Sequence, residues 1–148
     1  MCNHLADHYF ERRDGRLLDI CCGRGEHMEI FNDIGFETHG IDRDGVGQDR
    51  GLNVSIADVE KDRLPFADNF FDSVMMKSAI EHIDNTEHLL QEIYRVMKPK
   101  AKVVITTCDW KKVYKIFYDD FTHVSPFTRA SLRDAMRMFG FEEVEVEH

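Results

Sequence analysis

The sequence lacks the marks of a secreted, membrane-spanning or thiolate-metal protein. Its four cysteines form no C-x-x-C pair, and no hydrophobic stretch near the N-terminus could act as a signal or a membrane span. The adjacent Cys21 and Cys22 therefore receive no redox or metal role. We expect a cytoplasmic protein without a membrane partner.

Positive charge is also scarce. The chain carries 19 lysine and arginine residues against 28 aspartate and glutamate residues, a net charge of −9 that repels phosphate backbones. We therefore expect a small-molecule substrate rather than a nucleic acid. Because 43% of the 148 residues are hydrophobic, residues 1–148 are expected to form a single domain with its own core.

Two common nucleotide-binding loops are absent or incomplete. No segment reads G-x-x-x-x-G-K-[ST], which excludes a P-loop, and Met28 stands where the dinucleotide pattern G-x-G-x-x-G needs its third glycine. What is there is a short apolar run that ends in Asp19, followed by Gly23 and Gly25. Glycines lack a Cβ, so the backbone can lie against a ligand. Alone, this segment leaves an ordinary strand-to-helix turn open as an alternative to a cofactor-binding turn.

Two further short strands are expected to end in acidic residues. The segment 37–42 ends in Asp42, whose carboxylate has the place that accepts hydrogen bonds from ribose hydroxyls in a Rossmann-like unit. The segment 54–57 is followed by Asp58 and then by the run 64–74, which reads L-P-F-x-D-x-x-F-D-x-V.

These three motifs, in this order, resemble those of class I S-adenosylmethionine (SAM)-dependent methyltransferases, in particular small type-11-like domains. The glycine turn is similar to the family's acidic-x-G-x-G-x-G motif, with Cys21 in place of the first glycine. The resemblance extends from Leu17 to about Val146 and implies SAM as the cofactor. It also implies that Asp58 contacts the adenine amino group and that the Val59 amide faces a ring nitrogen. The cofactor-binding residues that it implies are Asp19, Cys21, Gly23, Gly25, Asp42, Arg43, Asp58, Val59 and Lys77.

Strand and helix patterns alternate along the chain. This alternation predicts a doubly wound, Rossmann-like α/β fold with a mostly parallel sheet and helices on both faces. Residues 43–53 are expected to be a loop or a single turn. Strands are expected at 17–20, 37–42, 54–57, 73–77 and 102–107, with an exposed one at 143–147, and helices at 5–12, 26–34, 86–97 and 128–139.

The resemblance also implies a seventh strand, which returns antiparallel between the fifth and the sixth, and no residues remain to form it. Either the chain is part of a longer protein, or the sixth strand pairs with the fifth directly or with another subunit. An open sheet edge favours association with other chains. We therefore expect this C-terminal edge to be marginally stable or to form a homo-oligomer.

The segment that follows the fourth strand, 77–83, should face the sulfonium of SAM, where acceptors approach. It has no [DN]-P-P-[YF] turn, which argues against the exocyclic amines of nucleobases. His82 could be a general base for a hydroxyl acceptor, or a histidine at a helix start that hydrogen-bonds locally. His123, in the loop after the fifth strand, is a second candidate base. Trp110 and Tyr114 fit an acceptor pocket or ordinary packing.

Glu81, His82 and His123 offer oxygen and nitrogen atoms that could meet around a metal ion. Methyltransferases that modify the 2′-oxygen at the 3′ end of small RNAs use E-x-x-E-H and a later histidine in this way, but here Ser78 replaces the first glutamate. Because the acidic chain does not favour RNA, we assign no metal site from the sequence.

The sequence thus predicts an enzyme that transfers a methyl group from SAM to a small-molecule acceptor, at oxygen rather than at a nucleobase nitrogen. The alternative is a protein that binds SAM without independent catalysis. It would be a regulatory or accessory subunit, or a methyltransferase core without its acceptor-recognition part. A nicotinamide-dependent dehydrogenase is a third interpretation.

Overall fold

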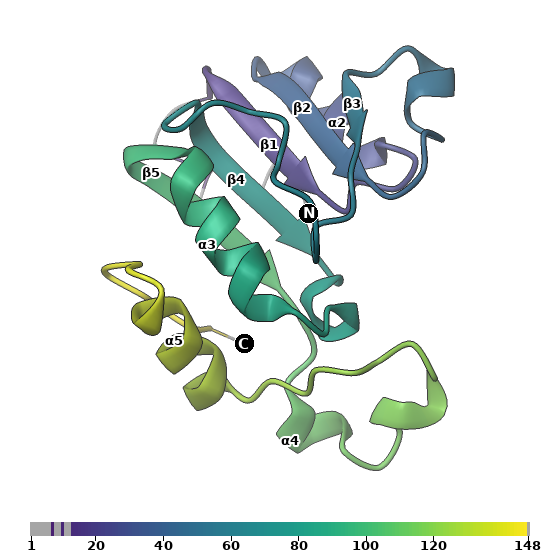
Figure 1. Cartoon of the computed structure of the whole chain (residues 1–148), viewed down its shortest axis with the longest axis vertical. Helices are drawn as coiled ribbons and strands as arrows, with labels where there is room; N and C mark the ends of the chain where they lie inside the picture. The colour runs from purple at the N-terminus through teal and green to yellow at the C-terminus, as the bar shows by residue number, and fades with distance from the viewer. Residues whose placement is uncertain (1–6, 8–9, 11–12, 148) are drawn as a thin grey trace.

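The computed structural model describes residues 7, 10 and 13–147, and its centre is a five-stranded parallel sheet (Figure 1). The strand order is β3-β2-β1-β4-β5. The chain moves outward in opposite directions from β1 and β4, so their carboxyl ends flank the switch point where open α/β sheets bind ligands. The strands are β1 (Arg16–Ile20), β2 (Glu37–Asp42), β3 (Val54–Ile56), β4 (Phe71–Lys77) and β5 (Met97–Thr106).

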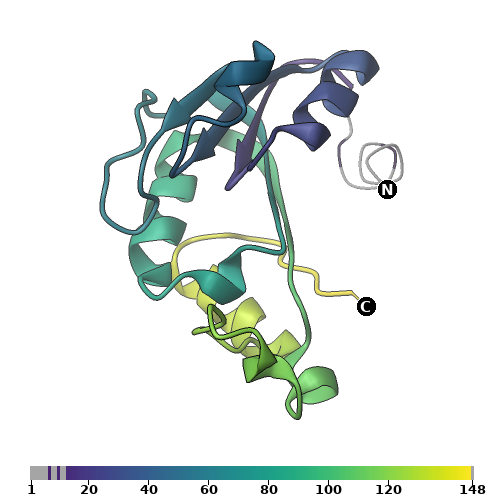
Figure 2. The same cartoon turned by 90° about the vertical axis from the view of Figure 1, so that its right-hand side faces the viewer.

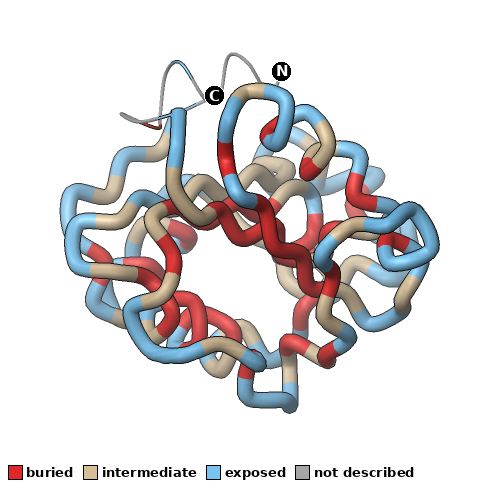
Figure 3. Tube along the Cα trace, turned by 90° about the horizontal axis from the view of Figure 1, so that it is seen from above, coloured by how far each residue is buried: buried red, intermediate tan, exposed pale blue. Residues whose placement is uncertain are grey.

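Two helices cover opposite faces of this sheet (Figure 2). Along β1, Leu17 packs in a cluster with Phe31, whereas the next residue, Leu18, packs in the cluster that contains Ile93. Since both faces of the central strands are covered, their sequences are continuous apolar runs rather than alternating ones. Buried residues run through the middle of the molecule, and exposed ones line its outside (Figure 3). The two helices are α2 (Glu26–Ile34) and α3 (Thr86–Val96).

A third helix, α5 (Arg129–Met138), extends the apolar layer on the α3 side. It begins with a reciprocal capping box, in which Thr128 accepts from the Ser131 amide and Ser131 accepts from the Thr128 amide. Leu132 and Met136 then join the cluster that contains α3. None of the described helices has the length and apolar character needed to cross a membrane. Between β5 and α5, the short helix α4 (Trp110–Val113) and the 3-10 turn η3 (Phe117–Asp119) extend beyond the carboxyl end of β5 (Figure 1).

Most predicted elements are confirmed, with small shifts at their ends. Residues 43–53 contain only the single turn η1 (Gln48–Arg50), as expected. The fifth strand begins at Met97 rather than at residue 102. Pro99 lacks the backbone N–H that would bond a neighbouring strand. β5 tolerates this proline because it lies at the sheet edge, where a missing N–H removes no hydrogen bond between strands. The helix predicted at 5–12 falls mainly on residues outside the described part of the chain.

The strand predicted at 143–147 is wrong, because this segment is irregular. Val144 and Val146 alternate with glutamates, but alternation gives a strand only where a hydrogen-bonded neighbour is available. In the described part of the chain the sheet ends at β5, and no strand lies on its outer side. Instead, the guanidinium of Arg129 donates to the carbonyl oxygen of Val146 at 2.5 Å.

Candidate active site

The predicted cofactor residues lie at the carboxyl edge of the sheet. Asp19 is the fourth residue of β1, Asp42 ends β2 and Lys77 ends β4. Asp58 follows β3 after a short extension of the strand. Parallel strands end on one side of their sheet, so the structure brings these residues to one edge, beside the glycine turn that follows β1.

The Asp42 carboxylate ties the end of β2 to the glycine turn. Its Oδ2 accepts a hydrogen bond from the Gly23 amide at 2.7 Å. Its Oδ1 accepts from the amides of Arg43 and Asp44 at 2.7 and 3.4 Å. Each carboxylate oxygen has two lone pairs, so Oδ2 retains capacity for a ligand hydroxyl.

The two glycines of the turn have different roles. Both adopt positive φ, 53° at Gly23 and 75° at Gly25. A Cβ at Gly25 would collide with Leu52, whereas a Cβ at Gly23 would meet nothing within 4 Å. A side chain at Gly25 would displace Leu52, while Gly23 leaves space in which a ligand can approach the backbone. Cys21, at the family's first glycine, keeps the positive φ at 57°, which costs about 1–2 kcal/mol for a residue with a side chain.

Asp19 contains an unsatisfied polar atom in the interior of the site. The residue is 2% exposed, and its Oδ2 has no hydrogen-bond partner among the described residues. Burial, followed by the nearby Asp42 carboxylate, raises the pKa of Asp19 to about 7, while Lys77 acts in the opposite direction. A cationic or hydrogen-donating ligand group would satisfy this oxygen.

Asp58 and Val59 lie in the turn after β3. The Asp58 carboxylate accepts from the Glu60 amide at 3.0 Å and from Lys61 Nζ at 3.1 Å, and these bonds hold the pKa of Asp58 below its ordinary value. Val59 is buried, and its amide has no protein acceptor in the described part of the chain. Arg43 pairs with Glu60 at 3.2 Å beside the same turn. The turn thus offers an unused amide next to a carboxylate.

The two cysteines of the glycine turn are unreactive thiols. Burial, followed by the charge of Asp42, raises the pKa of Cys21 to about 12. Burial, followed by the charge of Asp19, raises the pKa of Cys22 to about 12. A thiol attacks as the thiolate, so neither cysteine is activated for nucleophilic chemistry.

His82 and His123 meet beyond the carboxyl end of β4. His82 ends the 3-10 turn η2 (Ile80–His82), and His123 lies in the loop before α5. Their ring centres are 4.7 Å apart. The loop is joined to η2 by the Ser125 amide, which donates to the carbonyl oxygen of Glu81 at 3.0 Å. One potential ligand atom from each of Glu81, His82 and His123 lies within 4.8 Å of the others.

Hydrogen bonds determine which nitrogen of each neutral imidazole carries the proton. The Thr122 hydroxyl donates its single proton to Asp120 at 2.6 Å, so it accepts from Nδ1 of His82 at 2.8 Å. Nδ1 of His123 donates to the carbonyl oxygen of Phe117 at 2.6 Å. Both neutral rings therefore keep the lone pair on Nε2.

Sequence reasoning missed the residues that orient this cluster. Thr107 donates to Oε2 of Glu81 at 2.8 Å, and Thr122 and Phe117 fix the two histidines. Of these three residues, only Thr122 could have been suspected from the sequence, because it is next to the candidate base His123. Phe117 acts through its backbone carbonyl, which any residue could supply.

Trp110 and Tyr114, the candidate acceptor-pocket aromatics, lie near the molecular surface. Their ring centres are 6.0 Å apart, and the residues are 36% and 53% exposed. The structure therefore places them outside the packed core.

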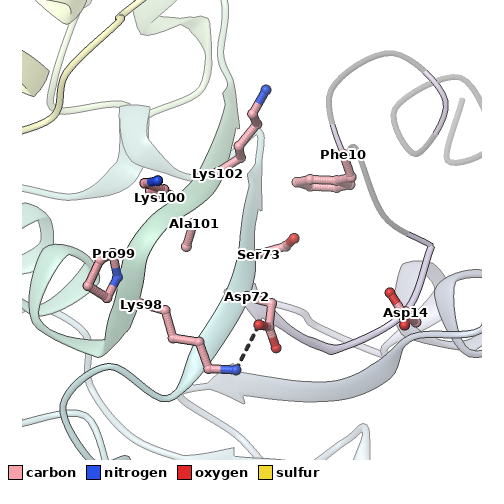
Figure 4. Close-up of a pocket in the computed structure, with 9 residues that line it drawn as sticks. All are labelled: Phe10, Asp14, Asp72, Ser73, Lys98, Pro99, Lys100, Ala101 and Lys102. Atoms are coloured by element: carbon pink, nitrogen blue, oxygen red, sulfur yellow. Dashed lines mark hydrogen bonds and ion pairs between the residues drawn. The ribbon is translucent and has the colours of Figure 1, made fainter.

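A separate cavity of about 160 Å³ lies at the opposite, amino end of β4 (Figure 4). Lys98 of β5 reaches Asp72 of β4 and pairs with it at 2.7 Å (Figure 4). Asp72 and Ser73 stand near the start of β4, whereas the predicted cofactor residues stand at strand ends. This cavity is therefore distinct from the candidate active site. Its lining is Phe10, Asp14, Asp72, Ser73, Lys98, Pro99, Lys100, Ala101 and Lys102.

Comparisons with known proteins agree with this geometry. The profile of a family described as "Methyltransferase domain" matches residues 3–146. A SAM-dependent methyltransferase from Archaeoglobus fulgidus is 29% identical, with a TM-score of 0.82 over 97% of this chain and 69% of that one. The demethylmenaquinone methyltransferase of Renibacterium salmoninarum is 31% identical over 94 residues, which are 61% of this chain and 40% of the relative. The sterol 4-C-methyltransferase strm-1 of Caenorhabditis elegans is 27% identical over 135 residues, 82% of this chain and 40% of the relative.

The chain thus spans less than half the length of these curated relatives. The family match covers nearly all of the chain, and the structural match covers 97% of it, which together with the parallel sheet confirms the predicted Rossmann-like fold. The chain belongs to the methyltransferase domain family, and SAM is the cofactor of the class I members that its motifs resemble.

Proposed function

We propose that this chain binds SAM at the carboxyl edge of its sheet and transfers the methyl group to a small-molecule acceptor, at oxygen. The observation that carries the proposal is the buried Asp19 carboxylate beside the glycine turn, whose Oδ2 has no partner among the described residues. SAM carries an ammonium group, which would supply this oxygen with both a hydrogen bond and a positive charge.

The other residues of the edge fit the remaining parts of SAM. Asp42 has lone pairs for the ribose hydroxyls, and the space beside Gly23 admits the ligand to the backbone. The unused Val59 amide suits a ring nitrogen of adenine, and Asp58 next to it suits the adenine amino group. Lys77 at the end of β4 is a cation for the carboxylate of the cofactor.

When bound, SAM supplies a methyl group on a positively charged sulfur, which needs no further activation. Transfer would join the acceptor oxygen to the methyl carbon and leave the electron pair of the broken carbon–sulfur bond on sulfur. The protein must therefore align the acceptor and remove the hydroxyl proton. Nε2 of His82 and Nε2 of His123 keep their lone pairs, because Nδ1 of each ring is the donor, and these two residues would accept the proton.

The histidine pair is what supports an oxygen acceptor. Among the relatives, one is named as a sterol 4-C-methyltransferase and another as a phosphoethanolamine N-methyltransferase. The names of the relatives therefore do not indicate which atom of the acceptor receives the methyl group. A hydroxyl is a weak nucleophile until its proton leaves, and two imidazoles with free lone pairs suit that need.

The first test is calorimetric titration of the chain with SAM, S-adenosylhomocysteine and NADH. We expect micromolar binding of the two adenosyl ligands and no binding of NADH. Absence of binding by both adenosyl ligands would contradict the proposal. Binding of NADH alone would favour a dehydrogenase.

The second test is turnover with a panel of acceptors that present a hydroxyl, an amine or an activated carbon. We expect multiple turnovers with a hydroxyl acceptor, and loss of turnover without loss of SAM affinity in the His82→Ala variant. Tight SAM binding without turnover on any acceptor would favour a SAM-binding protein that lacks independent catalysis.

A further inference from the structure

The cluster of Glu81, His82 and His123 has more organisation than a pair of bases needs. One potential ligand atom from each residue lies within 4.8 Å of the others. The three side chains come from η2 and from the loop before α5, and the backbone bond from Ser125 to Glu81 holds these two segments together.

Each member of the cluster is oriented by an outer partner. Thr107 holds Oε2 of Glu81 at 2.8 Å, Thr122 holds Nδ1 of His82 at 2.8 Å, and the Phe117 carbonyl holds Nδ1 of His123 at 2.6 Å. The atoms left over are Oε1 of Glu81 and the Nε2 lone pairs of both histidines. Metal-ligating histidines commonly donate their other ring N–H to an outer acceptor in this manner.

The buried carboxylate of Glu81 favours binding of a cation. Glu81 is 4% exposed, and in the described part of the chain no lysine or arginine pairs with it. A second carboxylate is near, because Oδ2 of Asp120 lies 4.0 Å from Nε2 of His123. A buried carboxylate without a cationic partner is costly, and a bound metal ion would offset that cost.

We infer that Glu81, His82 and His123 form a binding site for a divalent transition-metal ion of the zinc class. Two nitrogens and one carboxylate oxygen are a donor set that zinc takes when it keeps a position open for substrate. In a tetrahedral site with ligands about 2.1 Å from the ion, two ligand atoms are about 3.4 Å apart, so the 4.8 Å cluster must close by about 1.4 Å through rotation of its side chains.

This inference rests on the proposed function for its chemical consequence. The open position would hold the acceptor hydroxyl, and the ion would lower the pKa of that hydroxyl. Water would then take the proton, and the oxygen would form its bond to the methyl carbon as the carbon–sulfur bond breaks with its electron pair on sulfur. With their Nε2 lone pairs on the ion, His82 and His123 would act on the acceptor proton through the metal, in place of accepting it themselves.

The test is metal binding by the chain after treatment with a chelator, measured without SAM or acceptor. Co²⁺ is the probe, because its visible absorption depends on its ligands. Zn²⁺ has no visible absorption, so its affinity is measured by its displacement of bound Co²⁺. We expect one Co²⁺ per chain. Affinity should fall at least about tenfold in His82→Ala and in His123→Ala, since each change removes a ligand.

The matched control is His88→Gln, because His88 lies on α3 and bonds the Asp62 carbonyl outside the cluster. Its affinity should equal that of the unchanged chain. Glu81→Gln keeps an oxygen for Thr107 but removes the charge, so it should also weaken Co²⁺ binding. If His123→Ala does not fold by circular dichroism, His82→Ala and Glu81→Gln still decide the question.

Absence of stoichiometric Co²⁺ binding by the unchanged chain would overturn the site. Equal affinity in the cluster variants and in His88→Gln would overturn it as well. Because the assay uses neither SAM nor acceptor, a negative result leaves methyl transfer intact. Conversely, metal binding without SAM binding would refute the proposed function and support the site.

Discussion

At the scale of single residues, Gly23 offers a sharp test of the cofactor site. A methyl group there would meet nothing within 4 Å, yet it would occupy the space proposed for SAM. We expect Gly23→Ala to lower SAM affinity at least tenfold in calorimetric titrations. The stability of the chain should fall by only about 1–2 kcal/mol, the cost of positive φ for alanine.

Gly51→Ala is the matched control for this change. Gly51 also has positive φ, at 75°, and its Cβ would also meet nothing within 4 Å, but it lies at the end of η1. Its stability loss should be similar and its SAM affinity unchanged. Equal losses of affinity in both variants would show that backbone strain, rather than occupation of the site, weakens SAM binding.

The buried Asp19 should make stability depend on pH. Its pKa is about 7 in the folded chain and 3.8 in an exposed position, so the folded chain keeps a proton that the unfolded chain releases between these values. The stability contribution is complete below about pH 4 and falls as the pH rises to about 7, by about 4 kcal/mol in total.

Urea unfolding at a series of pH values measures this effect. The Asp19→Asn variant has no titrating group at this position. Its free energy of unfolding should therefore fall little between about pH 4 and about pH 7, and the variant should be more stable than the unchanged chain at pH 8. Parallel pH profiles for the two proteins would contradict the raised pKa. Excess SAM should also reduce the decline, since its ammonium group favours the ionised carboxylate.

Sequence reasoning predicted the positions of the candidate site residues better than it predicted their hydrogen-bond partners. Asp19, Asp42 and the two histidines stand where strand ends and motif spacing put them, and the structure brings each to the expected edge or cluster. The sequence could not identify Phe117, because its contact is made by the backbone carbonyl oxygen, which every residue type has. The tautomers of the histidines also depend on such contacts.

At the scale of elements, Arg95 clamps the L-P-F segment onto α3. Its guanidinium donates to the carbonyl oxygens of Leu64 and Phe66 at 3.0 and 2.9 Å, and to Glu92 at 2.7 Å. Glu92 is 9% exposed and also accepts from the Leu64 amide at 2.7 Å. The hydrogen bond from Arg95 is the main cause that holds the pKa of Glu92 below its ordinary value. Arg95 also pairs with Asp68, the aspartate of the same motif, at 2.8 Å, so a motif that marks the family in the sequence is stabilised by two ion pairs of one arginine.

Removing Arg95 should therefore destabilise the chain strongly. We expect Arg95→Ala to lose about 3–5 kcal/mol in urea unfolding, because Glu92 remains buried without its cation. Adding Glu92→Gln should recover part of that loss, since the two changes remove one interaction. Arg137→Ala, on the exposed last turn of α5, is the control and should change stability by less than about 0.5 kcal/mol. Equal small losses in both single variants would contradict the clamp.

Elements with strong periodicity were predictable, as α3 and α5 show. Two differences have one physical origin. The early start of β5 and the irregular 143–147 segment both depend on which strands lie beside them, and period-2 patterns carry no information on neighbours. The turn and short helix between β5 and α5 lacked the length that periodicity requires.

At the scale of the whole molecule, the sheet has an open edge within residues 13–147. β5 is the last strand in its order, and Val103, Val104 and Ile105 on it are only partly buried. Open edges of this kind pair with strands of other chains, and nearby lysines such as Lys100 and Lys102 oppose such pairing. The association expected from the sequence therefore has a definite location.

We expect the weight-average mass of the chain in light scattering to rise with concentration, because a second copy can pair along β5. Val104→Lys should shift this rise to higher concentration, since a charge on an edge strand disfavours pairing. Val46→Lys should have no effect, because this valine is 41% exposed and lies in the connection between β2 and β3, the two strands farthest from β5 in the sheet order. Amide exchange at 144–146 should be fast in dilute samples, since this segment is irregular. A monodisperse monomer at all concentrations, with slow exchange at 144–146, would show instead that the C-terminal segment closes the edge within one chain.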